Sequence, residues 1–207
     1  MYRPPVFAEE RAKVLHGLMR AHPFATLVTL GPDGLTADHV PMILHADEGG
    51  HGILRCHVAR PNPVWKGFDA AAGALAIFQG PHHYVSPGWY PSKAEHGKVV
   101  PTWNYCVVHV RGQLSVVEDA ARLRAHLDAL TAMQEAGRAE PWAPSDAPAD
   151  YIEKMIGGLV GLELRISEMH GKWKMSQNRG EADRAGVRDG LAAEGTEAAS
   201  EAAKLVP

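Results

Sequence analysis

The sequence has little of several features that mark common functional classes. Its 207 residues include only two cysteines, Cys56 and Cys106, and no CxxC pair. A dithiol redox motif or a zinc knuckle is therefore unsupported, and we expect two buried free thiols. No apolar run approaches the ~18 residues that a membrane-spanning helix needs. The first residues lack the basic and then apolar pattern of a signal peptide, so we expect a cytoplasmic protein without a membrane segment.

Positive charge is also scarce. Lysine and arginine number 21 against 24 acidic residues, which gives a formal net charge of −3 at pH 7. Proteins that bind DNA or acidic membranes through bulk electrostatics usually carry a basic excess. The sequence shows no helix-turn-helix pattern and no basic recognition helix. Direct DNA binding is therefore poorly supported, while a hydrophobic fraction of 45% is typical of a globular protein.

The local motifs of several enzyme classes are missing. Neither GxGxxG nor GxxxxGKS or GxxxxGKT occurs, so dinucleotide and triphosphate cradles are unsupported. A GxSxG nucleophile elbow is also absent. The 12 histidines include no HExxH pair, and His82-His83 falls in a predicted loop, so we expect no metal site. No general base stands out either, and the sequence identifies no catalytic residue.

The sequence does contain a series of short apolar segments separated by turn residues. Residues 24–30 and 35–44 flank a strong turn signal, Gly31-Pro32-Asp33-Gly34, and predict a hairpin. Apolar runs predict further strands at residues 52–58, 74–78, 99–117 and 159–167. Tight turns rather than crossover helices join the early strands, which argues against a doubly wound parallel sheet. We predict a mainly β fold with peripheral helices (α+β), built on a closed or nearly closed antiparallel barrel.

Helices and boundaries complete the predicted organisation. Apolar spacing and capping signals predict helices at residues 14–19, 64–68, after Asp119 and at 151–157. Asn62 would cap the second of these, with Pro63 at its first position. Residues 80–101 indicate a long loop rich in glycine and proline. We expect one domain over residues 1–180 and a flexible tail, rich in alanine and glutamate, over residues 181–207.

Four segments at the ends of predicted strands are rich in polar and aromatic residues. They are residues 38–41, 57–65, 101–105 and 171–178. Folds of this kind place ligand sites at such positions. A phosphate needs an arginine or lysine and backbone N–H groups, which Arg60 and the helix capped by Asn62 would supply. An aromatic ring system needs a flat apolar wall and hydrogen-bonding groups, and suitable side chains are Thr102, Trp103, Asn104, Trp173, Gln177 and Asn178.

This chemistry fits a phosphorylated aromatic ligand but does not identify which one. In an extended segment, Lys172 and Lys174 would share one side and Trp173 would face the other. Each residue also has a structural alternative. Trp103 and Trp173 could be packing residues, Arg60 a surface salt-bridge partner, and the two lysines solvated charges.

Seven ordered motifs resemble those of the PaiB-like family, over residues 1 to about 190. They are Met1-Tyr2; His39-Val40-Pro41; His57-Val58-Ala59-Arg60 with Asn62-Pro63 and Trp65; Phe78-Gln79-Gly80-Pro81; Tyr84-Val85-Ser86-Pro87 with Trp89-Tyr90; Pro101-Thr102-Trp103-Asn104-Tyr105; and Gly171-Lys172-Trp173-Lys174 with Ser176-Gln177-Asn178-Arg179.

The resemblance implies an FMN-binding split β-barrel similar to pyridoxamine-phosphate oxidase-like proteins, working as a homodimer with the flavin at the subunit interface. By analogy, Ala59, Arg60 and Asn62 would lie near the phosphate, and Thr102 and Asn104 near the flavin ring. The segment Lys172-Trp173-Lys174 would reach the site from the partner subunit. The implied cofactor-binding residues are His39, His57, Ala59, Arg60, Asn62, Trp65, Thr102, Trp103, Asn104, Lys172, Trp173, Lys174, Gln177 and Asn178.

The resemblance also implies a role in negative regulation of transcription, and three functions stay open. The first is an FMN-binding protein with a redox or sensing role, which could be an FMN-dependent oxidoreductase. The second is a DNA-binding transcriptional repressor without catalysis, which the acidic balance disfavours. The third is a haem-binding or haem-handling protein on the same barrel, which would need a histidine that ligates iron.

Overall fold

The computed structural model describes residues 1–207, and they form two compact units. Unit 1 contains Met1–His22, Phe78–His109 and Met169–Pro207, and unit 2 contains Pro23–Ile77 and Val110–Glu168. Where the sequence predicts one domain and a tail, the chain therefore crosses between two units several times. None of the helices is long and apolar enough to span a lipid bilayer.

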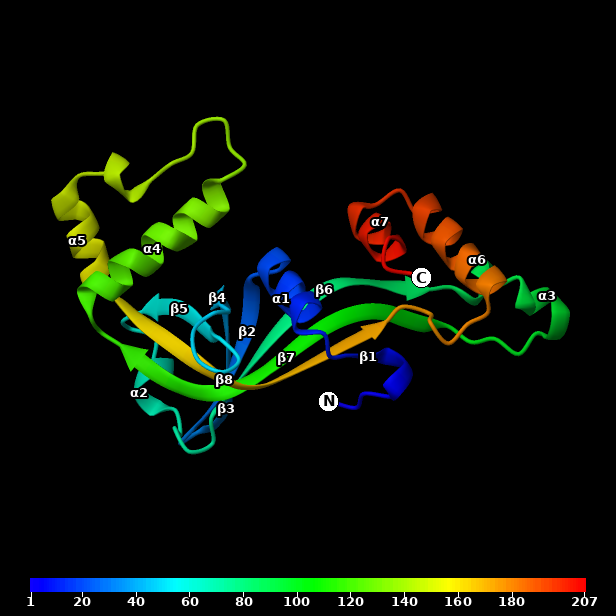
Figure 1. Cartoon of the computed structure of the whole chain (residues 1–207), viewed down its shortest axis with the longest axis horizontal. Coiled ribbons are helices and arrows are strands. Elements are labelled where there is room, and N and C mark those ends of the chain that lie inside the picture. Colours follow the sequence, from blue (N-terminus) through cyan, green and yellow to red (C-terminus); the bar gives the residue numbers. More distant parts are fainter. The chain divides into compact units, whose positions relative to one another are not determined.

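Antiparallel strands form the centre of the fold, as the sequence predicts (Figure 1). The strands are β1 (Ala8–Glu9), β2 (Phe24–Gly31), β3 (Gly34–Pro41), β4 (Ile43–His45), β5 (Ile53–Ala59), β6 (Ala74–Val85), β7 (Thr102–Val117) and β8 (Leu159–Lys174). Their order in the sheet is β3-β2-β6-β7-β8-β5-β4, with β1 paired to β8. The helices are α1 (Ala12–Ala21), α2 (Val64–Gly67), α3 (Ser92–His96), α4 (Ala120–Glu135), α5 (Ala149–Gly157), α6 (Glu181–Ala193) and α7 (Glu197–Ala203), with 3-10 turns at Pro5–Phe7, Pro87–Trp89 and Pro144–Asp146.

Unit 2 contains the predicted hairpin. Gly31 pairs with Gly34 across the two-residue turn, and Gly34 has a φ of 103°, which favours glycine. Alternation along β2 buries Ala25 and Leu27 on one face. The predicted second strand is two strands, β3 and β4, because the chain breaks at Met42, whose N–H donates to the Pro23 carbonyl at 2.9 Å.

Two helices cover part of unit 2. Asp119 caps α4, since its Oδ1 accepts from the Arg122 N–H at 2.8 Å. Leu123 of α4 is buried against Ile152 and Ile156 of α5. Both helices follow the sequence prediction, and their apolar contact fixes α4 against α5.

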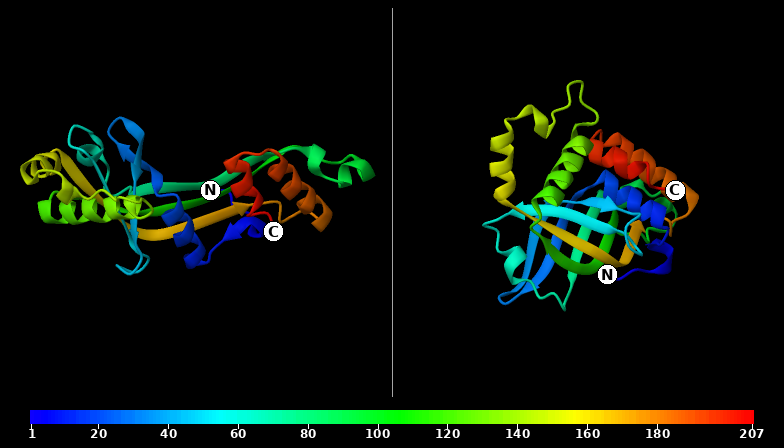
Figure 2. Two further views of the ribbon diagram at one scale, coloured as in Figure 1. Left: turned by 90° about the horizontal axis from the view of Figure 1, so that it is seen from above. Right: turned by 60° about the vertical axis from the view of Figure 1, so that its left-hand side comes forward.

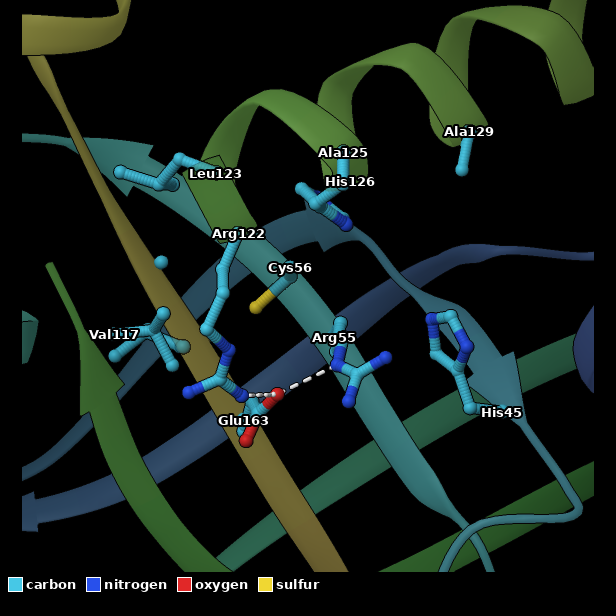
Figure 3. Close-up of a pocket in the computed structure, with 12 residues that line it drawn as sticks. His45, Arg55, Cys56, Val117, Arg122, Leu123, Ala125, His126, Ala129 and Glu163 are labelled. Atoms are coloured by element: carbon cyan, nitrogen blue, oxygen red, sulfur yellow. Dashed lines mark hydrogen bonds and ion pairs between the residues drawn. The ribbon is translucent and has the colours of Figure 1, made fainter. Parts of the chain in front are cut away.

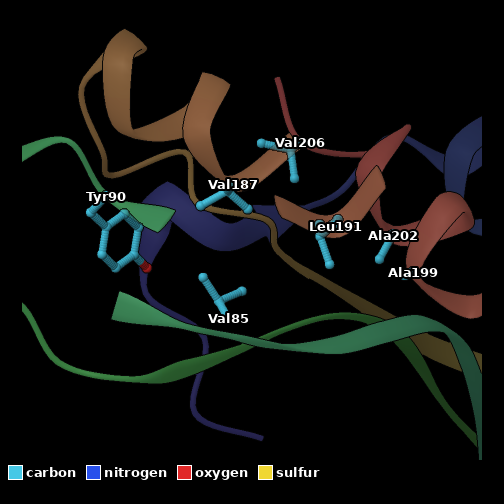
Figure 4. Packing of buried hydrophobic residues seen from close by; sticks show 7 residues of the cluster. All are labelled: Val85, Tyr90, Val187, Leu191, Ala199, Ala202 and Val206. Carbon is cyan, nitrogen blue, oxygen red and sulfur yellow. The ribbon is translucent and has the colours of Figure 1, made fainter. Parts of the chain in front are cut away.

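The C-terminal residues of unit 1 are helical and packed, where composition predicts a flexible tail. Helices α6 and α7 lie against each other (Figure 2). Val187 and Leu191 of α6 and Ala199 of α7 are fully buried in a cluster with Val85 and Tyr90 (Figure 4). Small alanines suffice here because neighbouring elements supply the large apolar groups. The burial of these residues gives the segment the apolar contacts that its own composition lacks.

Close packing around Trp89 requires two glycines of α6. Gly186 and Gly190 lie four residues apart on one helix face. A Cβ at Gly186 would collide with the Trp89 carbonyl, and one at Gly190 with the Trp89 ring. The glycines that make the tail look flexible in sequence therefore let Trp89 lie directly against the helix.

The segment predicted as a long loop, residues 80–101, is partly regular. Strand β6 continues to Val85, and a 3-10 turn and α3 follow. Val85 is fully buried in the cluster with Tyr90, so tertiary packing overrides the weak strand propensity of Gly80 and Pro81. Cys56 and Cys106 are both buried and free, as predicted, and burial raises the pKa of each thiol to about 12.

Candidate functional site

The structure places the sequence-predicted site residues in two groups, one in each unit. Unit 1 holds Thr102, Trp103, Asn104, Lys172, Trp173, Lys174, Gln177 and Asn178. Unit 2 holds His39, His57, Ala59, Arg60, Asn62 and Trp65.

In unit 1, four of the predicted residues line one small pocket, which we call the Lys174 pocket. These four are Thr102, Asn104, Lys174 and Asn178. The pocket has a volume of about 90 Å³. Its remaining lining residues are Tyr90, Val100, Ser176 and Arg179. The segments at the start of β7 and the end of β8 therefore meet, as the sequence suggested for the ends of strands.

Lys174 is the central cation of this pocket. Its Nζ donates to the Thr102 hydroxyl and to the Trp103 carbonyl, the latter at 2.6 Å. An ammonium has three N–H donors, so one stays available to a ligand. Burial, with Lys172 and Arg179 nearby, lowers the pKa of Lys174. An anion bound in the pocket would raise the pKa of Lys174 again, because it would pair with the charged amine.

A buried hydrogen bond holds the two sides of the Lys174 pocket together. The Asn104 amide donates to the Ser176 hydroxyl at 3.0 Å, and both side chains are buried. Ser176 has a φ of 64°, which is uncommon for a residue other than glycine. Gln177 fixes the same turn, since its Nε2 donates to the Trp173 carbonyl at 2.5 Å and its Oε1 accepts from the Met175 N–H at 2.7 Å. The turn after β8 is therefore held by side chains on both sides.

Arg179 adds a second cation, which the sequence did not single out. Residues 179–184 carry charges of both signs, which is a pattern typical of a solvated segment rather than of an anion site. In the structure Arg179 lines the pocket, with its guanidinium carbon 4.6 Å from the centre of the Tyr90 ring. Glu181 pairs instead with Arg184 and Arg188, so no carboxylate lines the Lys174 pocket. Two cations, a hydroxyl and amides facing a space without acids suit a small anion.

Lys172 has a different role from Lys174. It is buried, and its Nζ donates to the Tyr2 carbonyl at 3.0 Å and lies 5.2 Å from the centre of the Tyr105 ring. The alternative that Lys172 is a solvated surface charge is thus wrong. Instead, Lys172 links the N-terminal segment to β8 through its hydrogen bond to Tyr2. Trp173 is partly buried, whereas Trp103 is 54% exposed and stacks on His82 with ring centres 6.1 Å apart.

In unit 2, Arg60 makes contacts within the protein. Its guanidinium donates to the Gly157 carbonyl at 3.0 Å, to the Leu159 carbonyl at 3.1 Å and to Glu118 at 2.9 Å. The salt-bridge alternative is therefore present in the structure. Three of the five N–H donors of a guanidinium are engaged, which leaves two for a ligand.

Asn62 and Trp65 organise the turn that follows β5. The Asn62 Oδ1 accepts from the Val64 N–H at 2.9 Å, and its Nδ2 donates to Asp38 at 2.6 Å. The prediction of Asn62 as the cap and Pro63 as the first helical residue is wrong by one position, because α2 starts at Val64 and Pro63 is its cap residue; Asn62 still accepts from the first helical N–H. Trp65 Nε1 donates to the Arg60 carbonyl at 3.0 Å. Because α2 is one turn long and its first N–H is taken by Asn62, it contributes less to phosphate binding than the sequence suggests.

The predicted histidines of unit 2 differ in exposure. His39 is exposed, and its ring centre lies 6.2 Å from that of Phe24. Ala59 is exposed at the end of β5. His57 is partly buried, and its Nδ1 lies 3.1 Å from Nε2 of His126 on α4. Burial lowers the pKa of His57, which favours a neutral imidazole.

Beside His126 lies a second pocket, which sequence reasoning missed (Figure 3). We call it the Arg122 pocket. It has a volume of about 180 Å³ and lies between α4 and strands β4, β5, β7 and β8. Its polar lining is His45, Arg55, Arg122, His126 and Glu163, and its apolar lining includes Val117, Leu123, Ala125, Ala129 and Leu162. These residues come from five elements that are separated in the sequence, so no local motif predicts the pocket.

Burial, and then the nearby His57, His45 and Arg55, lower the pKa of His126 to about 4. The imidazole is therefore neutral at pH 7. Neither here nor elsewhere in the chain is a group of three or more His, Cys, Asp or Glu side chains arranged to hold a metal ion.

Comparisons with known proteins agree with the predicted family. A family model described as "Putative FMN-binding domain" matches residues 1–168. An uncharacterized protein of Emericella nidulans is 33% identical, and the match covers 100% of this chain and 96% of that protein. The protease synthase and sporulation protein PAI 2 of Bacillus subtilis is 31% identical, again over 100% of this chain and 96% of its own length.

Solved structures agree with the predicted fold. The flavocytochrome Anf3 from Azotobacter vinelandii has a TM-score of 0.63 at 15% identity, covering 89% of this chain and 78% of that chain. An FAD and heme binding protein from Mycobacterium smegmatis has a TM-score of 0.56 at 19% identity, covering 81% of this chain and 73% of that chain. The antiparallel sheet with peripheral helices is thus the split-barrel fold that the sequence predicts, shared with these proteins.

Proposed function

Because the chain belongs to the PaiB-like family of FMN-binding domains, we propose that it binds FMN and that the Lys174 pocket holds the cofactor's phosphate. The observation that carries this proposal is the composition of the pocket. Lys174 and Arg179 face it together with the Thr102 hydroxyl, and no carboxylate lines it. A volume of about 90 Å³ suits a phosphate better than a flavin ring system.

The protein's contribution is to bind and orient the cofactor. FMN supplies hydride or electron transfer when bound, which supports a redox or sensing role. Lys174 and Arg179 would supply charge-assisted hydrogen bonds to the phosphate. The Asn104–Ser176 hydrogen bond would keep the donors in place, so little side-chain freedom is lost on binding. No side chain is assigned a proton-transfer step.

We further propose a homodimer with the flavin at the subunit interface. Exposed aromatic and apolar residues of unit 1 support a partner contact, since Trp103, Tyr84 and Val100 are 54%, 43% and 65% exposed. The rings of Trp103 and Tyr84 contact each other with centres 6.3 Å apart, which makes one continuous aromatic surface. Sedimentation of the protein with and without FMN tests this; a monomer under both conditions would contradict it.

A role in negative regulation of transcription remains part of the proposal. The name of the Bacillus relative connects that protein with protease synthesis and sporulation. The net charge of −3 argues against direct DNA binding here, so regulation would act through the flavin or through a protein partner. A salt-dependent affinity for duplex DNA would favour the repressor alternative instead.

The decisive experiment compares FMN with riboflavin, which lacks the phosphate. Purified protein is titrated with each flavin and followed by flavin fluorescence and by the absorption bands near ~370 and ~450 nm. Lys174→Ala should weaken FMN about tenfold or more, because a charge-assisted hydrogen bond is lost. The same variant should change riboflavin affinity little.

Lys93→Ala provides the matched control, because Lys93 is an exposed lysine of unit 1 that does not line the pocket. Equal losses for FMN and riboflavin in Lys174→Ala would remove the phosphate from this pocket. A protein that retains neither flavin would contradict FMN binding altogether, and an intense haem absorption band in its place would favour the haem alternative.

A further inference from the structure

We propose that the Arg122 pocket of unit 2 is a second ligand site, which binds a small carboxylate anion with an apolar body. The site would be separate from the FMN phosphate site, because none of its lining residues lines the Lys174 pocket. Three features carry the proposal: the size of the space, its division into an apolar and a polar side, and buried imidazole nitrogens that have no partner in the protein.

The size of the pocket sets the size of the ligand. Its volume is about 180 Å³. A cavity of about 150 Å³ admits a molecule the size of benzene. Leu123, Val117 and Leu162 provide an apolar wall. A ligand with one ring or a short branched chain would therefore fill the space.

Two guanidinium groups face the opposite side, and Arg122 has the most capacity to bind an anion. Arg55 donates to Glu163 at 2.6 Å and to both oxygens of Glu48 at 2.9 and 2.6 Å, which uses three of its N–H groups. Arg122 donates to Glu163 alone (Figure 3). Four of its five N–H donors are thus unused by side chains that line the pocket. A carboxylate could accept two of these in a forked geometry.

The histidines provide the second polar contact. His126 Nδ1 and His45 Nε2 are both buried and lack a hydrogen-bond partner in the protein. A buried polar group without a partner costs roughly 1–3 kcal/mol, so such groups mark positions for a ligand or an ordered water. When His57 Nδ1 donates to His126 Nε2, the proton of His126 is on Nδ1 and can be donated to a ligand oxygen. A carboxylate could accept from both Arg122 and His126, and the one acid that lines the pocket, Glu163, is already paired with Arg55 and Arg122.

Benzoate is a suitable probe, with benzamide as its uncharged analogue of the same shape. Calorimetry or ligand-observed NMR measures the binding of each to the whole chain, both without FMN and with FMN in excess. We expect benzoate to bind measurably and at least roughly tenfold more tightly than benzamide, because only the anion forms charge-assisted hydrogen bonds. Arg122→Met should remove this preference. Arg124→Met, which alters a neighbouring arginine of α4 that pairs with Asp128, is the matched control.

A second variant tests the space rather than the charge. Ala129 is exposed on α4 and lines the pocket, so Ala129→Leu should fill part of the volume without disturbing the core. It should weaken benzoate at least roughly fivefold while leaving thermal unfolding unchanged. Glu163 keeps its Arg55 partner in Arg122→Met, so that variant should also stay folded.

Several results would overturn the proposal. They are no benzoate binding to the wild-type chain, equal affinity for benzoate and benzamide, and equal effects of Arg122→Met and Arg124→Met. Competition between FMN and benzoate would show instead that the pocket belongs to the flavin site. Because benzoate binding is measured separately, failure of FMN binding would leave this inference to be judged on its own.

Discussion

The Asn104 amide donates to the Ser176 hydroxyl at 3.0 Å, although the two residues are 72 positions apart in the chain. Asn104 belongs to β7, and Ser176 follows the end of β8. Both side chains are buried, and the Ser176 hydroxyl can also donate back to Asn104 Oδ1 at 3.2 Å. The pair therefore closes the small pocket that contains Lys174.

This relationship predicts coupling between the two side chains. In a double-mutant cycle of Asn104→Ala and Ser176→Ala, each single change should lower the free energy of unfolding by about 1–3 kcal/mol, because the remaining partner is left buried without a hydrogen bond. The double variant should lose less than the sum, with an interaction energy of about 0.5–1.5 kcal/mol. Denaturant unfolding measures these values, and additive losses would show that the two groups act independently.

Arg60 should contribute more to stability than to FMN binding. Arg60→Ala removes hydrogen bonds to two backbone carbonyls and to Glu118, so unfolding should become easier by about 1–3 kcal/mol. The loss of FMN affinity should be smaller than in Lys174→Ala. Fluorescence titration of both variants with FMN tests this. If Arg60→Ala lost as much FMN affinity as Lys174→Ala or more, the phosphate would bind at Arg60, as the sequence predicted.

The buried His126 should make the stability of the protein depend on pH. In the folded chain its pKa is about 4, below the ~6.5 of an exposed histidine in the unfolded chain. Between these values the unfolded chain binds more protons, so the free energy of unfolding rises with pH. The contribution is complete above about pH 6.5 and is lost as the pH falls towards 4.

His126→Phe keeps a ring of similar size and removes the titration. Between pH 7 and pH 5 its loss of stability should be smaller than that of the wild type by about 1–2 kcal/mol, measured by denaturant unfolding at each pH. The exposed His96 offers a control position. Identical pH profiles for wild type and His126→Phe would show that burial of this imidazole does not govern the profile.

Because α6 packs on Trp89, replacing its Gly190 by alanine should destabilise the protein rather than stabilise it. Replacing a helical glycine by alanine usually stabilises a helix by up to ~1 kcal/mol. Gly190→Ala should instead destabilise the chain by about 1–3 kcal/mol, because the new methyl group would collide with the Trp89 ring. Gly17→Ala in α1 is the control, since a Cβ there meets nothing within 4 Å. A more stable Gly190→Ala in thermal unfolding would mean that α6 does not pack on Trp89.

Much of the fold could be predicted from local sequence signals. The turn before Gly34 and the capping residue Asp119 act on neighbouring residues, so their effects are visible in sequence. The length of β6 and the packing of α6 were not predictable in this way. Both depend on Val85 and Leu191 meeting in one buried cluster, although the residues are far apart in the chain.

The candidate site likewise contains some residues that local sequence signals indicate and others that only tertiary contacts reveal. Polar residues at strand ends indicated Thr102, Asn104 and Lys174, and the structure brings them together. Arg179 was missed because its neighbours carry charges of both signs, and only tertiary contacts show that Glu181 pairs elsewhere. The roles of Lys172 and Arg60 also depend on partners distant in sequence, namely Tyr2 and Glu118.

The position at which β8 ends matters when a gene of this family is truncated for expression. The family match ends at residue 168, but β8 runs on to Lys174. A product cut at the matched boundary would end inside a strand, without Ser176 or Arg179, and would leave Val85 without its cover of α6 and α7. Poor solubility or loss of flavin absorption in such a truncated product would be caused by the truncation and would not be a property of the full-length protein.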